Sequence, residues 1–238
     1  MQSTATQHRS VQSKKPTHRN KIPTIRTTTR SSSANKAHLR PPTISTPQPQ
    51  TYEMTATIAD PLALTRQWIE RAVIGLNLCP FAKAVYIKQQ LRLVLSDATK
   101  PETLLEHLAK ELLLLRDTPA EHIDTTLIVH PHVLTDFLDY NDFLDNVDAI
   151  IKTLDLQSIL QVASFHPKYQ FHGTPPDDMS NYTNRSPYPS LHLLREKSVD
   201  HAIAAFPDPN VIVQRNIQTL KRLGDTGWQQ VLAGTQIE

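Results

Sequence analysis

Three residues in the middle of this sequence have side chains that could act together on a small molecule. Cys79 is the only cysteine, and a thiolate is a nucleophile when a cation, a helix N-terminus or a histidine lowers its pKa. His166 follows a strand-like run, and histidine can transfer protons near neutral pH. Arg185 lies among prolines and tyrosines, which would hold its guanidinium ready to bind a carboxylate or phosphate. We therefore predict Cys79 and His166 as catalytic residues and Arg185 as an anion-binding residue.

Each of these predictions competes with a structural interpretation. Cys79 follows the C-terminal end of a predicted helix, where the helix dipole disfavours a thiolate, and its neighbours Leu78 and Phe81 are apolar. Packing in the core is therefore the other interpretation of this cysteine. Arg185 would act as a loop clamp instead if it paired with Asp177 or Asp178. Both questions stay open from the sequence.

A long polar loop surrounds the last two of these residues. Residues 166–189 show no helical or strand period over 24 positions, whereas loops beyond about 12–15 residues are uncommon in compact domains. Four aromatic residues and five prolines indicate an ordered loop that shapes a pocket together with residues 77–82. Five further residues are predicted to bind substrate there, namely Lys168, Tyr169, Asn184, His192 and Arg195.

Two histidines follow strand-like runs, in the pairs His130-Pro131 and His166-Pro167. If the two strands are parallel neighbours, both imidazoles lie at the carboxyl edge of the sheet, where ligands prefer to bind. His132, His172 and His192 could join them as metal ligands or as acid and base groups. No tight ligand spacing such as H-E-x-x-H is present, so the sequence predicts no metal site and identifies no cofactor.

Composition excludes several protein classes. A single cysteine excludes a disulfide framework and a zinc site built on several thiolates. The five glycines form neither G-x-G-x-x-G nor a P-loop motif. The longest uncharged and mostly apolar stretch, residues 72–82, is far shorter than the roughly 20 residues of a membrane span. We expect a soluble, cytoplasmic protein that makes no membrane contact.

Charge is distributed unevenly along the chain. Residues 1–50 contain nine Lys or Arg and no acidic residue, which leaves 16 basic and 23 acidic residues in the rest. We expect residues 1–55 to form a disordered tail rich in Ser, Thr and Pro, because they can bury little apolar surface. The tail's basic residues could make weak contact with nucleic acid or act in targeting. A single globular domain is predicted over residues 56–224, followed by a C-terminal tail over 225–238.

Hydrophobic periodicity predicts alternating helices and strands in that domain. We expect helices over 61–76, 101–115, 137–154, 198–206 and 209–224, and strands over 84–88, 91–96, 125–130, 159–165 and 190–195. The first two strands are close enough to form a hairpin. This order predicts an α+β fold in which a mixed β-sheet of about five strands is packed with helices, as a ferredoxin-like or related sandwich.

Three segments together resemble a known protein family. They are WIERAVIGLNLCPFA (68–82), VASFHPKYQFHGTPPDD (162–178) and NYTNRSPYPSLHLLRE (181–196). The chain is similar over residues 60–224 to a mostly bacterial family catalogued as domain of unknown function 1415. The resemblance supports the domain boundaries and implies a bacterial, cytoplasmic setting. It implies no reaction and no ligand.

Two functional hypotheses remain from the sequence. The first is a small-molecule enzyme, a hydrolase or transferase, in which Arg185 orients an anionic substrate, His166 moves a proton and Cys79 is the nucleophile. The second is a binding or assembly protein that docks a partner on the 166–189 loop. Convergence of Cys79, His166 and Arg185 on one concave surface would favour the enzyme. The sequence does not indicate an oligomeric state.

Overall fold

The computed structural model describes residues 60–205 and 209–235. The predicted N-terminal tail, residues 1–55, lies outside the described residues. The elements follow in chain order as α1 (Pro61–Trp68), η1 (Ile69–Ile74), α2 (Ala82–Ile87), β1 (Leu91–Leu95), α3 (Pro101–Asp117), β2 (Thr125–Val129), α4 (Phe137–Thr153), β3 (Leu160–Phe165), η2 (Met179–Asn184), β4 (Ser190–Arg195), α5 (Glu196–Ala204) and α6 (Pro209–Ala233).

The four strands form one mixed sheet in the order β1-β2-β4-β3. Strand β1 is parallel to β2, while β4 is antiparallel to both β2 and β3. Strands β1, β2 and β3 therefore run in one direction, and β4 runs in the opposite direction between two of them. The predicted α+β class with a mixed sheet is confirmed, although the sheet has four strands where about five were predicted.

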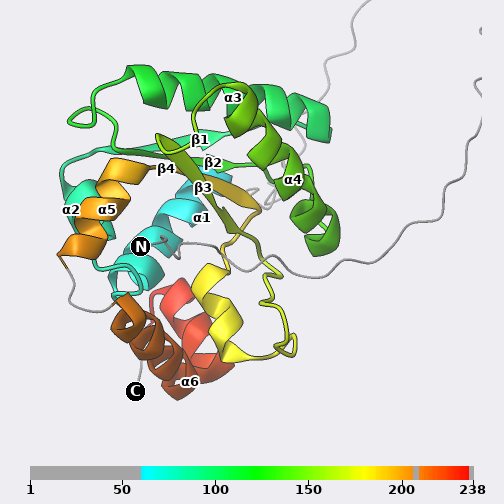
Figure 1. Ribbon diagram of the computed structural model, residues 1–238. Coiled ribbons are helices and arrows are strands. Elements are labelled where there is room, and N and C mark those ends of the chain that lie inside the picture. Colours follow the sequence, from blue (N-terminus) through cyan, green and yellow to red (C-terminus); the bar gives the residue numbers. More distant parts are fainter. Residues whose placement is uncertain (1–59, 206–208, 236–238) are drawn as a thin grey trace, which may run out of the picture. The chain divides into compact units, whose positions relative to one another are not determined.

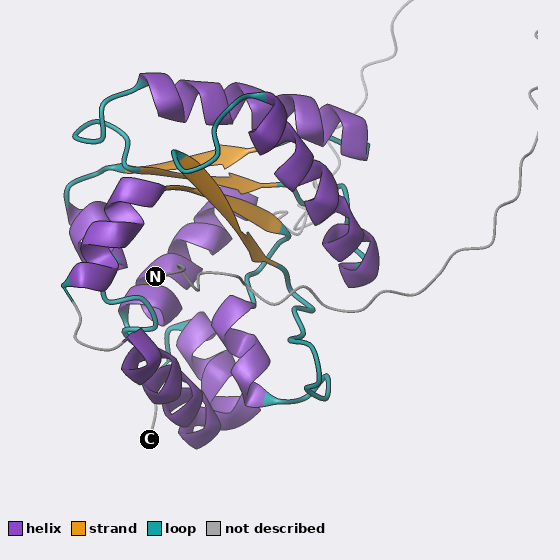
Figure 2. Ribbon diagram, viewed as in Figure 1, coloured by secondary structure: helices purple, strands orange, loops and turns teal. Residues whose placement is uncertain are grey.

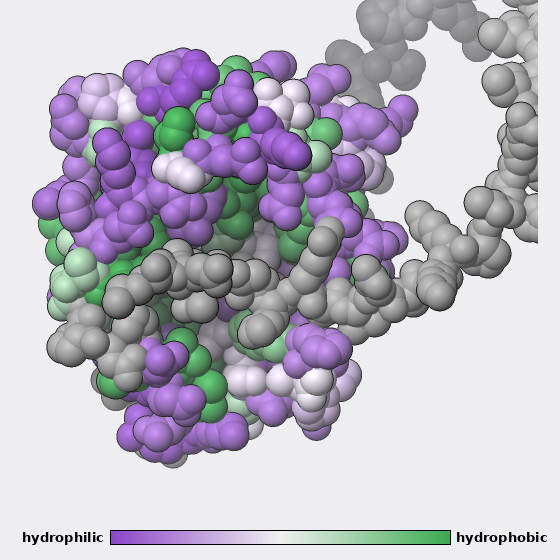
Figure 3. All heavy atoms as spheres, in the orientation of Figure 1, coloured by the Kyte–Doolittle hydropathy of each residue, from purple (hydrophilic) through white to green (hydrophobic). Residues whose placement is uncertain are grey.

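Helices pack on both faces of the sheet (Figures 1 and 2). One face buries a core with α3 and α4, in which Leu104, Leu108 and Leu112 contact side chains such as Ile128 and Leu193 of the sheet. The other face buries a second core around Trp68, Leu127 and Leu220, which come from α1, β2 and α6. Successive residues of β2 point to opposite faces, so Leu127 and Ile128 each anchor a different layer of helices. On the face seen in Figure 3, hydrophilic residues prevail over α3 and α4.

The predicted strand at 84–88 is wrong, because this segment is the helix α2. Val85, Tyr86 and Ile87 have high strand propensity, but such propensity depends strongly on context. Tyr86 packs against the second core, and its hydroxyl donates a hydrogen bond to Glu70 on η1. Gln89 then has a φ of 58°, which turns the chain into β1. These contacts fold the segment as a helix, and no hairpin precedes β1.

The last helix extends beyond the predicted end at Gly224. This glycine has φ 63° and ψ −179°, so the chain kinks there and then continues as helix to Ala233. Glycine tolerates this backbone conformation at little cost, unlike residues with a Cβ atom. Trp228 and Val231, which follow the kink, are buried in the second core. Residues 225–233 are therefore part of the folded structure and not of a C-terminal tail.

The predicted absence of a membrane span agrees with the lengths of the elements. Within residues 60–205 and 209–235, no helix is both long and apolar enough to cross a bilayer.

Candidate functional site

The carboxyl edge of the sheet brings together three polar residues. Ser96, His130 and His166 directly follow β1, β2 and β3, and all three are buried. The two histidines share this edge because β2 and β3 run in the same direction. The sequence interpretation assumed that β2 and β3 are neighbours. They are not, because β4 lies between them.

The hydrogen bonds of His166 leave it no free lone pair. Its Nδ1 accepts a hydrogen bond from the backbone N–H of Lys168 at 3.0 Å, so the proton lies on Nε2, which donates to the carbonyl of Leu134 at 3.3 Å. Its ring packs 5.4 Å from the Phe137 ring and 5.1 Å from the Tyr140 ring, between centroids. Burial lowers the pKa of His166, which favours the neutral form. This arrangement gives His166 a structural role and no lone pair for use as a general base.

His130 is buried next to Tyr140, which also packs against His166. Its Nδ1 donates to the carbonyl of Val133 at 3.1 Å, and its ring stacks on Tyr140 at 5.8 Å. Burial lowers the pKa of His130 to about 4, so the ring is neutral near pH 7. Its Nε2 has no hydrogen-bond partner among the described residues. The hydroxyl of Tyr140 is occupied, because it donates to the carbonyl of Ser190 at 2.8 Å.

His192, predicted to bind substrate, lies within β4 and is engaged with the neighbouring strand. Its Nε2 donates to the hydroxyl of Thr125 at 2.7 Å, and that hydroxyl donates to the carbonyl of Leu193 at 2.6 Å. Burial lowers the pKa of His192 to about 4. These bonds cross-link β2 and β4, and they keep His192 away from the loop.

Arg195 lies at the other end of β4 from the loop. Its guanidinium donates hydrogen bonds to backbone carbonyls at the end of α3 and in the turn before β2, which belong to Leu115, Thr118 and Ile123. Lysine and arginine side chains commonly satisfy the last carbonyls of a helix in this way. Arg195 therefore stabilises a turn and does not enlarge a positive spot around Arg185.

The 166–189 loop is ordered around one buried amide. The Asn181 side chain accepts hydrogen bonds from the backbone N–H of Phe171 at 2.9 Å and the hydroxyl of Thr174 at 2.8 Å. It also donates to the carbonyl of Pro175 at 2.9 Å. Asp178 caps η2, because its carboxylate accepts a hydrogen bond from the N–H of Ser180 at 2.8 Å. Asp178 is one of the two residues that were considered as ion-pair partners of Arg185.

The remaining predicted binding residues of the loop have different surroundings. Asn184 donates to the carbonyl of Ser164 at 3.2 Å and so fastens the loop to β3. The ring of Tyr169 packs 5.3 Å from Phe137, and burial raises its pKa. The side chain of Lys168 is exposed. Asn184 and Tyr169 therefore hold the loop in place.

Arg185 fastens the loop and also borders a pocket. Its Nε donates to the carbonyl of Tyr169 at 3.3 Å and its Nη2 to the carbonyl of Pro176 at 2.5 Å. The guanidinium carbon lies 4.2 Å from the centre of the Tyr182 ring, which is a cation–π contact. The predicted clamp exists, but its acceptors are carbonyl oxygens and not Asp177 or Asp178. Its Nη1 makes no hydrogen bond within the described residues.

The pocket beside this arginine, here named the Arg185 pocket, has a volume of about 220 Å³. It lies between the loop, α1 and the part of α6 after the kink. Its lining consists of Trp68, Pro167, Tyr182, Arg185, Ser186, Pro187, Trp228, Gln229 and Leu232. Residues 77–82, which were expected to help build the pocket, contribute no side chain to this lining.

The two tryptophans of the chain are among the residues of this pocket that the sequence interpretation missed. Both Trp68 and Trp228 line it, and both are buried. The indole Nε1–H of Trp68 has no acceptor among the described residues. Trp228 packs edge-on against Tyr182 at 5.4 Å. Two tryptophans at the two ends of a domain give no sequence signal that they meet, because their contact depends on how α6 folds back onto α1.

Cys79 lies in the turn after η1 and is half buried. Its backbone N–H donates to the carbonyl of Val73 at 3.3 Å, and its own carbonyl accepts from the N–H of Ala82 at 3.2 Å. Within the described part of the chain, its thiol makes no hydrogen bond with His166 or Arg185. The three predicted residues therefore do not form a linked catalytic group.

The described residues also contain no cluster of three or more His, Cys, Asp or Glu side chains that could hold a metal ion. Of the histidines considered as metal ligands in the sequence, His130 and His166 both pack against Tyr140.

Comparison with known proteins identifies the family of the chain. Neither a curated protein nor a solved structure matches it. A family model matches residues 61–230, which include every strand of the sheet and all residues of the Arg185 pocket except Leu232. The chain therefore belongs to the family described as "Protein of unknown function (DUF1415)".

Proposed function

We propose that this protein binds a small organic anion in the Arg185 pocket. The proposal keeps the anionic ligand predicted from the sequence and assigns it to a pocket between the loop, α1 and α6. It does not include a reaction between Cys79 and His166, because both nitrogens of His166 are engaged and Cys79 does not line the pocket.

The observation that carries the proposal is the indole N–H of Trp68. This donor is buried in the wall of the pocket and has no acceptor among the described residues. Leaving a buried donor unpaired costs about 1–3 kcal/mol. The N–H is shielded from solvent, so the indole ring must turn for a ligand oxygen in the pocket to accept this hydrogen bond and recover the free energy.

Arg185 supplies a positive charge to the same pocket. Its bonds to the carbonyls of Tyr169 and Pro176 hold the guanidinium in place without neutralising it, because carbonyl oxygens have no formal charge. The Nη1 amino group remains for a ligand. A guanidinium fixed in this way loses little conformational entropy on binding an anion. Burial and the Asp225 carboxylate raise the pKa of Tyr182, so its phenol stays uncharged.

The walls of the pocket indicate the rest of the ligand. Trp68, Trp228 and Leu232 are apolar over most of their surface, whereas Ser186 and Gln229 are polar. The volume of about 220 Å³ corresponds to roughly seven water molecules at liquid density, which suits a ligand much smaller than a nucleotide. A carboxylate or phosphate attached to one small ring or a short chain fits both the size and the chemistry.

The test compares benzoate with its neutral isostere benzamide. Both tryptophans of the chain line the pocket, so tryptophan fluorescence and the two indole N–H signals in NMR report directly on occupancy. We expect benzoate to perturb both signals and to bind at least tenfold more tightly than benzamide. Equal affinities, or no binding of benzoate at millimolar concentration, would disprove the proposal.

Two variants separate the contributions of the pocket's donors. Arg185→Gln should weaken benzoate binding by about 10–100-fold, because a hydrogen bond to a charged group is worth about 1.5–3 kcal/mol. Trp68→Phe keeps an aromatic ring but removes the N–H, and should weaken binding by about fivefold. Arg222→Gln is the matched control, since Arg222 is exposed on α6 and does not line the pocket. It should leave the affinity unchanged.

A further inference from the structure

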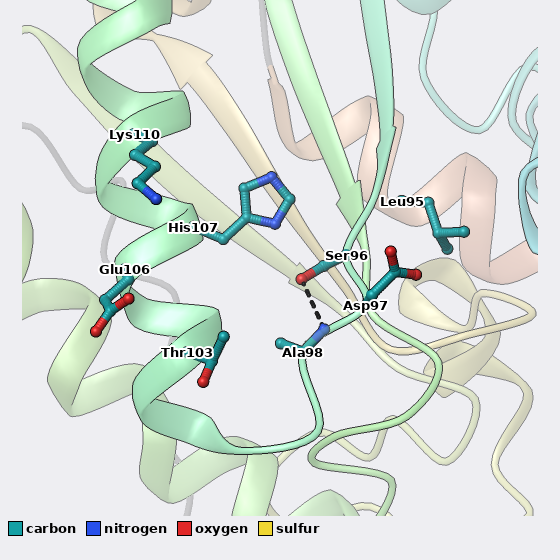
Figure 4. Close-up of a pocket in the computed structure, with 8 residues that line it drawn as sticks. All are labelled: Leu95, Ser96, Asp97, Ala98, Thr103, Glu106, His107 and Lys110. Atoms are coloured by element: carbon teal, nitrogen blue, oxygen red, sulfur yellow. Dashed lines mark hydrogen bonds between the residues drawn. The ribbon is translucent and has the colours of Figure 1, made fainter.

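A second pocket lies on the other face of the sheet, between the end of β1 and α3. It has a volume of about 330 Å³, and its lining consists of Leu95, Ser96, Asp97, Ala98, Thr103, Glu106, His107 and Lys110. In Figure 4 the ring of His107 projects from α3 toward the end of β1, and the hydroxyl of Ser96 points toward α3. The carboxylate of Asp97 points away from the helix in the same view.

Ser96 has the position of a nucleophile in a strand–turn–helix unit. It directly follows β1 at the carboxyl edge of the sheet, and its backbone N–H continues the strand by donating to Val129 at 2.8 Å. Ser96 is buried and lines the pocket, so a substrate must reach its hydroxyl through the pocket. The Ser96 hydroxyl oxygen accepts a hydrogen bond from the N–H of Ala98 at 3.4 Å. Its own proton has no acceptor among the described residues.

His107 is oriented by a fixed acidic residue. Its Nε2 lies 3.8 Å from Oε1 of Glu111, one helical turn further along α3. Glu111 is buried and is held by Arg92 through two hydrogen bonds of 2.8 and 2.9 Å. The carboxylate favours a proton on Nε2, which leaves the Nδ1 lone pair as a base. Nδ1 has no hydrogen-bond partner among the described residues.

The first turn of α3 adds hydrogen-bond donors at the edge of the same pocket. The helix begins after Lys100, whose side chain does not cap it, and Pro101 occupies the first position. The N–H groups of Glu102 and Thr103 therefore have no capping side chain, and Thr103 lines the pocket. Free amides at a helix N-terminus stabilise negative charge that develops on an oxygen atom.

We infer that Ser96 and His107 form a nucleophile–base pair that cleaves small uncharged carboxylic esters, with Glu111 as the positioning residue. The Ser96 oxygen attacks the ester carbonyl carbon while His107 takes the hydroxyl proton. The bond to the alcohol oxygen then breaks, and His107 returns the proton to the leaving alcohol, which leaves an acyl group on Ser96. Water attacks that acyl carbon, gives a proton to His107 and releases the carboxylic acid, and Ser96 regains its proton.

The rim of the pocket restricts the substrate. Asp97 and Glu106 contribute two negative charges against one positive charge from Lys110, so an acidic substrate would be repelled. Leu95 and Ala98 supply an apolar wall for a short acyl chain. This inference concerns a different pocket from the anion site and stands independently of it.

The first experiment treats the full-length protein with a biotinylated fluorophosphonate, which phosphonylates activated serine hydroxyls, and locates the label by mass spectrometry. We expect one label per chain, on Ser96. Ser96→Ala should abolish it, whereas Ser190→Ala, which removes a buried hydroxyl from the same sheet edge, should keep it. No label on the wild type, or a label on another residue, would overturn the inference even if Ser96→Ala does not fold.

The second experiment measures the rates of labelling and of p-nitrophenyl acetate hydrolysis. His107→Gln should lower both rates at least tenfold, and folding of the variant is checked by its thermal melt. Glu111→Gln should lower both rates while Glu111→Asp, which keeps the carboxylate, retains most of the activity. Wild-type rates in folded His107→Gln would overturn the inference. If the labelling and hydrolysis rates of the two Glu111 variants fall only in proportion to their melting temperatures, Glu111 has no part in the mechanism.

Discussion

The 166–189 loop and the segment from Ser96 to Lys110 use their polar groups in opposite ways. In the loop, Asn181 makes three hydrogen bonds to neighbouring loop residues, and Arg185 makes two to loop carbonyls. In the β1–α3 segment, the Ser96 proton and the Nδ1 of His107 have no partner among the described residues. The loop attracts attention in the sequence through its aromatic residues, prolines and arginine, whereas residues 96–110 contain no such pattern.

This difference shows why a conspicuous loop is a poor guide to chemistry. A long segment without helix or strand must satisfy its backbone and side-chain polar groups in other ways, and this requires unusual residues. Its distinctive composition therefore reflects its own folding first. Residues with free donors or acceptors also occur in ordinary elements, such as the end of β1, the start of α3 and the indole of Trp68 in α1.

The largest expected effect is on the stability of the loop. Asn181→Ala should lower the free energy of unfolding by about 3 kcal/mol, because it removes three hydrogen bonds made by a buried amide and leaves part-buried partners unpaired. Ser96→Ala should cost less than about 1 kcal/mol, since the hydroxyl makes one long hydrogen bond. Urea denaturation of both variants measures the difference. A similar loss of stability in both would contradict the contrast between the two regions.

The next effect concerns His130, which directly follows β2, and His192 in β4. Burial lowers the pKa values of His130 and His192 to about 4 in the folded state, while unfolding restores them to about 6.5. The unfolded chain therefore binds more protons between these values, so this stability is present above pH 6.5 and is lost as the pH falls toward 4. Each histidine should cost about 2 kcal/mol between pH 7 and pH 5.

His192→Gln tests this dependence, because glutamine keeps an amide donor for Thr125 but cannot gain a proton. The unfolding free energy of the variant should fall less between pH 7 and pH 5 than that of the wild type, by about 2 kcal/mol. The measurement is the change of the unfolding free energy with pH and not its value at pH 7, because the substitution also changes the stability at pH 7. Identical slopes would show that His192 is accessible to protons in the folded state.

The smallest effect is expected at Cys79. Its thiol is half buried and makes no hydrogen bond within the described residues, so Cys79→Ala should change the unfolding free energy by less than about 1 kcal/mol. As the only cysteine of the chain, it reports alone on alkylation by iodoacetamide. We expect slow reaction in the native protein, at a rate that His166→Gln does not alter. Clearly slower alkylation of Cys79 in the His166→Gln variant would support the predicted Cys79–His166 pair.

Most of the fold follows from local patterns in the sequence. The apolar stripe of α3 and the buried runs of β2 and β3 have periods that identify them without any tertiary information. Segment 82–87 could not be assigned in this way, because Tyr86 is fixed as part of a helix by contacts with η1. Gly224 indicates a helix end, and only the packing of Trp228 against Tyr182 explains why helix resumes after it.

The candidate site was predictable only in part. The chemistry of Arg185 could be inferred from its neighbours, and the structure gives it both a loop contact and a pocket position. The partners of His166 could not be inferred, because they are backbone groups of Lys168, in the turn after β3, and of Leu134, in the segment between β2 and α4. Trp68, Ser96 and His107 have common residue types in ordinary elements, so only their spatial neighbours distinguish them.

The position of β4 in the sheet has a consequence for how the chain folds during synthesis. Among the described strands, β3 pairs only with β4, and β4 also completes the pairing of β2. A ribosome that has made residues up to 189 has therefore produced β3 without its partner strand, and an unpaired strand edge invites association with other chains. Leu191 and Leu193 of β4 also fill the core beneath α3 and α4. Nascent chains should thus gain resistance to proteases only after β4 has emerged from the exit tunnel.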